Sequence, residues 1–174
     1  MSSKFDVGVA EYVLNGDAQK LPAVAEQGLQ EGLDTPSLRI LAGLDENANP
    51  FELEDYLHRS LRELNYSILS KKQAINTGLE YYARQIKEGS IDPIEGARII
   101  SDEYLEKIDE NMFGQVKKYA YDNVSIHMAA IYGDYDSYCD YRDLYPNGTD
   151  SDDVYKTKQH IVREAEKYVT EVQA

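Results

Sequence analysis

The sequence lacks the features that place a chain in a membrane or in an oxidising compartment. It contains one cysteine and no tryptophan, and nowhere does it approach the run of about 20 apolar residues that a membrane-spanning helix needs. A single thiol, that of Cys139, closes neither an internal disulfide nor a cysteine-based zinc site. The first residues, MSSKF, have neither the basic nor the apolar region of a signal peptide. We therefore expect a cytoplasmic protein that is neither exported nor inserted in a membrane.

Positive charge is also scarce. The 174 residues include 32 acidic and 18 basic side chains, which gives a net charge of −14. Such a field repels polyanions and attracts cations. Nucleic acid and anionic membrane surfaces are therefore excluded as expected partners, and a basic protein is favoured. Acidity that serves solubility alone is the competing explanation of the same charge.

Motifs that reveal catalysis in a single sequence are missing as well. There is no glycine-rich phosphate loop, no nucleophile elbow and no H-E-x-x-H zinc motif. Asp134, Asp136 and Asp140 resemble the start of a calcium loop, but its middle glycine and its twelfth-position acid are absent. The sequence therefore predicts no catalytic residue and no cofactor, and it favours a role other than that of an enzyme.

Helical periodicity is the pattern that is present. Apolar residues recur at spacings of three and four, and the alternation typical of strands is nearly absent. Three helix starts combine a capping residue with a following proline: Thr35-Pro36, Asn49-Pro50 and Asp92-Pro93. The expected helices cover approximately residues 5–14, 20–30, 37–44, 50–64, 68–86, 93–108, 111–144 and 151–172.

These segments predict an all-α fold. We expect a single domain over residues 1–174, a bundle of about eight helices with about four long helices at its core and short N-terminal helices packed across it. The segment that starts at Asn111 is expected to form one helix of about 30 residues, provided that Gly133 does not break it.

Tyrosine usage is the least ordinary feature of the composition. The chain has 15 tyrosines and 3 phenylalanines. Five tyrosines follow one another at spacings of three, three, three and four, which place them along one slowly drifting stripe of the predicted helix. Three aspartates at spacings of four and three form a second stripe beside it. We call these eight residues the tyrosine ridge: Tyr132, Tyr135, Asp136, Tyr138, Asp140, Tyr141, Asp143 and Tyr145.

The tyrosine ridge suggests a surface that binds a partner. Tyrosine offers a large rigid face and a hydroxyl at low entropic cost, and it is enriched at binding hot spots. Neighbouring aspartates steer a basic partner toward such a face. Our leading hypothesis is an acidic helical interaction module that binds a basic protein. The alternative for each tyrosine is an ordinary place at the boundary between core and solvent.

In kind, the chain is similar to the small acidic helical immunity proteins that neutralise basic nuclease toxins. The likeness lies in composition and surface chemistry, and no shared motif carries it. It implies an inhibitor-like role through binding. A structural or regulatory subunit with an apolar interface is a further alternative, and a homo-oligomer is compatible with either role.

A metal-binding bundle is the alternative from another class. Asp55 and His58 lie three residues apart, and His160 and Glu164 lie four apart, so each pair can project from one face of a helix. Bundle metalloproteins bring such pairs together around ions, although their usual Glu-x-x-His spacing is not repeated here. His127 is expected to be a core histidine with one hydrogen bond.

Overall fold

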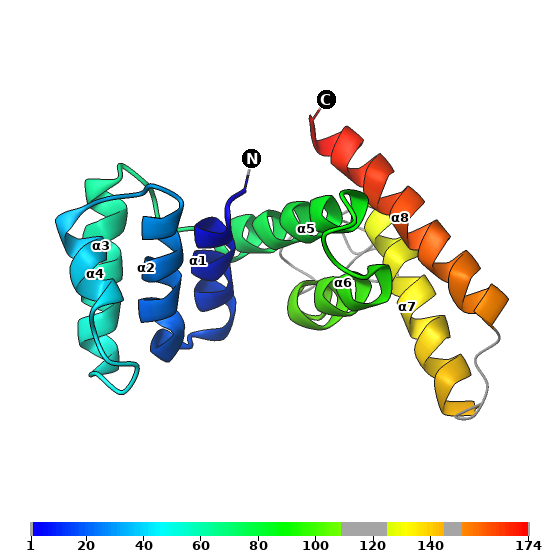
Figure 1. Ribbon diagram of the computed structural model, residues 1–174, viewed down its shortest axis with the longest axis horizontal. Helices are drawn as coiled ribbons and strands as arrows, with labels where there is room; N and C mark the ends of the chain where they lie inside the picture. The colour runs from blue at the N-terminus through cyan, green and yellow to red at the C-terminus, as the bar shows by residue number, and fades with distance from the viewer. Residues whose placement is uncertain (1, 109–124, 145–150, 174) are drawn as a thin grey trace. The chain divides into compact units, whose positions relative to one another are not determined.

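The computed structural model describes residues 2–108, 125–144 and 151–173 (Figure 1). Eight α-helices and no β-strand occur within these ranges, so the predicted all-α fold is confirmed. The chain divides into two compact units, Met1–Gly78 and Leu79–Ala174, and the division falls inside helix α5 (Lys71–Lys87). The single domain over residues 1–174 stays a prediction, because this division does not say whether each unit folds alone.

The first unit contains four α-helices with a core of their own. They are α1 (Lys4–Asn15), α2 (Leu21–Gln30), α3 (Pro36–Ala42) and α4 (Pro50–Glu63), and the short 3-10 helix η1 (Ala18–Lys20) precedes α2. Helix α2 packs against α1 and α3, and α3 packs against α4. The core residues are Phe5, Val9, Ala18, Leu21, Ala25, Leu38, Leu41, Leu53, Leu57 and Leu61.

Local sequence signals set the ends of these helices. The Ser3 hydroxyl accepts a hydrogen bond from the Asp6 backbone N–H, and the Asp6 carboxylate accepts one from the Ser3 N–H, which makes a capping box at the start of α1. Thr35 caps α3 and Asn49 caps α4, as the cap-plus-proline pattern predicts. At the other end of α1, Gly16 adopts the left-handed conformation, with a φ of 71°.

A glycine allows α1 and α2 to approach closely. A Cβ atom on Gly28 of α2 would lie 2.8 Å from Cδ2 of the buried Phe5 ring on α1. That distance is shorter than an ordinary van der Waals contact, so any side chain at this position would force the two helices apart.

Two glutamates tie helix starts to distant segments of the first unit. The Glu31 carboxylate accepts hydrogen bonds from the backbone N–H groups of Lys4 and Phe5, at 2.9 and 3.2 Å. The Glu63 carboxylate accepts from the Ser37 N–H at 3.0 Å and from its hydroxyl at 2.6 Å. These bonds lower the pKa of Glu63. Both carboxylates satisfy donors that a helix leaves unpaired in its first turn.

The second unit contains the rest of α5 and the helices that follow it. They are α6 (Pro93–Ile99), the π-helix η2 (Ile100–Tyr104), the 3-10 helix η3 (Leu105–Lys107), α7 (Ile126–Leu144) and α8 (Ser151–Gln173). Helices α7 and α8 pack against each other as an antiparallel pair, and α6 packs against both (Figure 1). The predicted helix over 93–108 thus forms, but only its first half is α-helical.

The buried side chains of the second unit come from all of these elements. Asp92 caps α6 by accepting from the Ile94 and Glu95 N–H groups, as predicted. A Cβ atom on Gly96 would lie 2.5 Å from Cγ1 of Ile86, so α6 lies directly against α5 there. The buried apolar residues are Leu79, Ala83, Ile86, Ala97, Ile100, Tyr104, Leu105, Ile108, Met128, Ile131, Ile161, Ala165, Tyr168 and Val169.

Candidate functional site: the acidic face of α7

Helix α7 begins later than the sequence predicts. Ser125 is not helical, and its hydroxyl accepts a hydrogen bond from the His127 N–H at 3.2 Å, as a capping residue does. A second bond, 2.8 Å long, joins that hydroxyl to the Glu171 carboxylate of α8. The prediction of one unbroken helix from Asn111 is therefore wrong, because Ser125 is not helical and caps the start of α7. Residues 109–124 lie outside the described ranges.

Beyond Ser125 the helix continues as the binding hypothesis requires. Gly133 lies within α7 and does not break it. Tyr132, Tyr135, Tyr138 and Tyr141 are therefore all helical, and each is half-buried. Tyr145 lies outside the described residues.

The tyrosines wind around α7 and do not lie along one stripe beside the aspartates, so this part of the prediction is wrong. Three residues turn an α-helix by about 300°, so each tyrosine is displaced by about 60° from the one before it, and Tyr132 and Tyr141 point about 180° apart. By the same geometry the three aspartates fall within a sector about 60° wide. This sector lies beside Tyr132 and faces away from Tyr138. The tyrosine ridge therefore consists of three aspartates on one face of α7 and tyrosines that are spread around the helix.

The aspartate face is open to solvent. Asp136, Asp140 and Asp143 are all exposed. A guanidinium nitrogen of Arg142 lies 3.2 Å from Asp143, and both side chains are largely exposed, so water screens this pair strongly. We define the α7 acidic face as Asp136, Asp140 and Asp143.

The first two tyrosines face other parts of the second unit. Burial, together with the charges of Asp136, Glu106 and Asp102, raises the pKa of Tyr132. Burial, a hydrogen bond with Cys139 and the charge of Asp102 raise the pKa of Tyr135 to about 12. Since Asp102 belongs to η2, these two rings lie at the boundary between α7 and η2. Both rings therefore fit the alternative of a core-to-solvent boundary.

The α7–α8 contact contains a cluster of charged side chains, in which only the His160–Glu164 pair was indicated by the sequence. Nδ1 of His127 lies 2.7 Å from Oε2 of Glu164, and Oε1 of Glu164 lies 2.6 Å from Nζ of Lys167. Nδ1 of His160 lies 2.5 Å from Oδ2 of Asp134, and its Nε2 lies 3.8 Å from Oε1 of Glu164. Histidine and carboxylate therefore alternate along the contact.

Glu164 lies at the centre of this cluster. Its side chain is 8% exposed, and burial alone would raise the pKa of its carboxyl group. The hydrogen bonds from Lys167 and His127 outweigh burial and lower the pKa. The predicted hydrogen bond of His127 is present, but its side chain is 22% exposed, so the prediction of a core histidine is wrong. The sequence could not identify Glu164 as the partner of His127, because the two residues lie 37 positions apart in the chain.

The four residues of the metal-site alternative belong to different compact units. Asp55 and His58 lie on α4 in the first unit, where Asp55 pairs with Arg59 at 2.5 Å and His58 is exposed. His160 and Glu164 lie on α8 in the second unit. No group of three or more histidine, cysteine, aspartate or glutamate side chains in the described part of the chain is placed to hold a metal ion.

Comparison with known proteins assigns no family to this chain: no family model, no curated protein and no solved structure matches it. Among the described residues, no helix is both long enough and apolar enough to cross a membrane.

Proposed function

We propose that this chain is an interaction module that binds a basic protein partner through the α7 acidic face. The observation that carries the proposal is the exposure of Asp136, Asp140 and Asp143 on one sector of a helix, in a chain with a net charge of −14. Three carboxylates on one sector give a partner a localised target, and the net charge extends the attraction beyond contact range.

The tyrosines have a secondary role in this proposal. Tyr132 flanks the aspartate sector, and its half-buried ring offers apolar area next to the charges. Tyr138 and Tyr141 continue around the helix, so a partner that grips the end of α7 from more than one side would meet them. Aromatic side chains in such a position supply the desolvated contact area that charged pairs at a rim do not.

A partner capture with charge-matched baits tests the proposal. The first bait is the natural chain, and the second carries Asp136→Asn, Asp140→Asn and Asp143→Asn. The third carries Glu26→Gln, Glu46→Gln and Glu52→Gln, which remove the same charge from exposed positions of the first unit. Each bait is incubated with lysate of the native host, and retained proteins are quantified by mass spectrometry.

We expect the natural chain and the glutamine bait to retain the same basic protein, and the asparagine bait to retain at least ten-fold less of it. A bait with Tyr138→Ala and Tyr141→Ala should show an intermediate loss. Equal recovery by the asparagine and glutamine baits would contradict the proposal, as would a retained partner that is acidic.

A further inference from the structure

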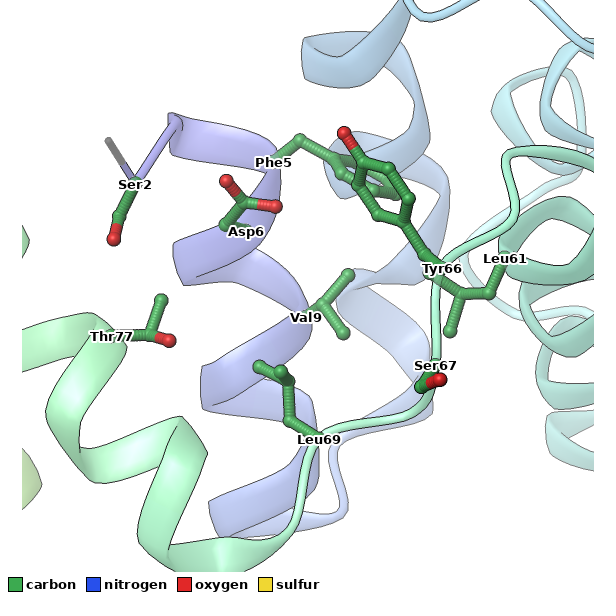
Figure 2. A pocket seen from close by; sticks show the side chains of 9 residues that line it. All are labelled: Ser2, Phe5, Asp6, Val9, Leu61, Tyr66, Ser67, Leu69 and Thr77. Atoms are coloured by element: carbon green, nitrogen blue, oxygen red, sulfur yellow. The ribbon is translucent and has the colours of Figure 1, made fainter.

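The first unit contains a cavity that plays no part in the function proposed for the α7 acidic face. Its volume is about 180 Å³, and it lies between α1, the segment that follows α4, and the part of α5 that belongs to this unit (Figure 2). Nine residues line it: Ser2, Phe5, Asp6, Val9, Leu61, Tyr66, Ser67, Leu69 and Thr77. A cavity of about 150 Å³ is large enough to bind benzene in a protein interior.

The turn that ends α4 shapes one wall. Asn65 has a φ of 57°, the left-handed conformation that commonly follows a helix. The Tyr66 N–H then donates to the Leu61 carbonyl at 2.8 Å, which closes the turn. The chain leaves α4 along the cavity, and Figure 2 shows Tyr66, Ser67 and Leu69 opposite the side chains of α1.

The floor and the mouth of the cavity differ in chemistry. Phe5, Val9 and Leu61 are each at most 3% exposed and provide an apolar floor. Tyr66 and Ser67 are exposed, so the cavity opens to solvent on their side. An apolar floor under a polar mouth suits a ligand with a compact hydrocarbon body and one polar group.

Asp6 determines which polar group fits. It is the one acidic residue among the nine described lining residues, and none of the nine is basic. Its Oδ2 accepts the capping bond from the Ser3 N–H. A carboxylate has about four acceptor positions on its two oxygens, so this bond leaves capacity for a second donor. A protonated amine is the donor that gains most from a carboxylate next to an apolar floor.

We propose that this cavity binds a small primary amine with a compact apolar body, its ammonium group at Asp6 and its body against Phe5, Val9 and Leu61. The site lies wholly in the first unit and is independent of the α7 acidic face. The lining also contains the hydroxyl groups of Ser67 and Thr77.

Three probes of equal body size test the ligand class. Benzylamine, benzyl alcohol and benzoate are titrated separately into the full chain, and binding is followed by amide chemical shifts in nitrogen-15 spectra. We expect saturable shifts in residues that line the cavity, with benzylamine binding about five-fold more tightly than benzyl alcohol and benzoate most weakly. Equal affinity for all three probes, or shifts confined to residues elsewhere, would overturn the proposal.

Two variants and a control locate the site. Asp6→Asn keeps an acceptor for the helix cap and removes the charge, so benzylamine should lose its five-fold advantage while benzyl alcohol binds as before. Val9→Phe fills the cavity and should abolish binding of both. Glu46→Gln removes a charge from an exposed position outside the lining and should change neither affinity. Benzylamine binding that Asp6→Asn leaves unchanged would contradict the assignment of the ammonium group.

Discussion

Nδ1 of His127 on α7 lies 2.7 Å from Oε2 of Glu164 on α8, and this contact joins residues that are 37 positions apart in the chain. Glu164 is nearly buried, and its other oxygen accepts from Lys167. The carboxylate therefore links α7 to α8 at the end of α7 that carries Ser125. The α7 acidic face lies further along the same helix, so this contact helps to set its position relative to α8.

Replacing Glu164 by glutamine should destabilise the protein. Glutamine keeps the shape of the side chain but loses the charge that His127 and Lys167 both contact. We expect the free energy of unfolding to fall by about 1–3 kcal/mol, the range for a hydrogen bond with a charged, buried partner. Urea unfolding measures it. Glu166→Gln, an exposed acid two residues away, is the control and should change it by less than about 0.5 kcal/mol.

The same carboxylate should make stability depend on acid pH. Its pKa is lowered in the folded protein, so the unfolded chain takes up the proton first as the pH falls. The stabilisation is fully present above the ordinary glutamate pKa of 4.5 and is lost as the pH falls through the lower folded value. The difference in unfolding free energy between the natural chain and Glu164→Gln should therefore shrink between pH 7 and pH 3. A difference that stays constant would contradict this role.

Tyr168 should make stability depend on alkaline pH. Its ring is 4% exposed, and burial together with the charges of Glu80 and Glu171 raises its pKa from 10.0 to about 12. The unfolded chain therefore loses this proton first, and the stabilisation present below pH 10 is lost as the pH rises toward 12. Tyr168→Phe keeps the ring and cannot ionise. In thermal melts from pH 9 to pH 11.5, the natural chain should lose more stability than this variant does.

Two glycine-to-alanine changes should act in opposite directions. Gly28→Ala brings a Cβ atom to 2.8 Å from the Phe5 ring, and overpacking of this kind lowers the free energy of unfolding by about 1–3 kcal/mol. A Cβ atom on Gly133 of α7 would have no neighbouring described atom within 4 Å outside the helix's own nearby backbone. Gly133→Ala should therefore raise the free energy of unfolding by about 0.5–1 kcal/mol, because alanine stabilises a helix relative to glycine. Chemical denaturation of both variants checks the pair. Equal effects would show that the α1–α2 approach is looser than described.

Features encoded locally were predictable from the sequence. Thr35, Asn49 and Asp92 cap helices because their side-chain oxygens accept from N–H groups two or three residues later, and the proline that follows each of them marks the helix start. On α8, Ile161 and Ala165 lie four residues apart on one face and are both buried, as helical spacing alone indicates, whereas Val172 near the end of the helix is 46% exposed.

Features that depend on tertiary packing were not predictable. The π-helix η2 interrupts a segment whose periodicity is regular, and nothing in its sequence marks the change. The pairs His127–Glu164 and Asp134–His160 need α7 and α8 to be aligned in one register, which spacing along a single helix does not reveal. The spacing of the tyrosines predicted the helix, but it did not reveal that the charge of Asp102 on η2 acts on Tyr132 and Tyr135.

We propose that the α7 acidic face attracts a basic partner through its charge. The most direct test of this claim is the association rate constant of the captured partner, measured by surface plasmon resonance as ionic strength rises. We predict a steep fall in rate for the natural chain, and a slower, flatter rate for the variant with Asp136→Asn, Asp140→Asn and Asp143→Asn. Identical rates and identical salt dependence for the two chains would contradict the claim.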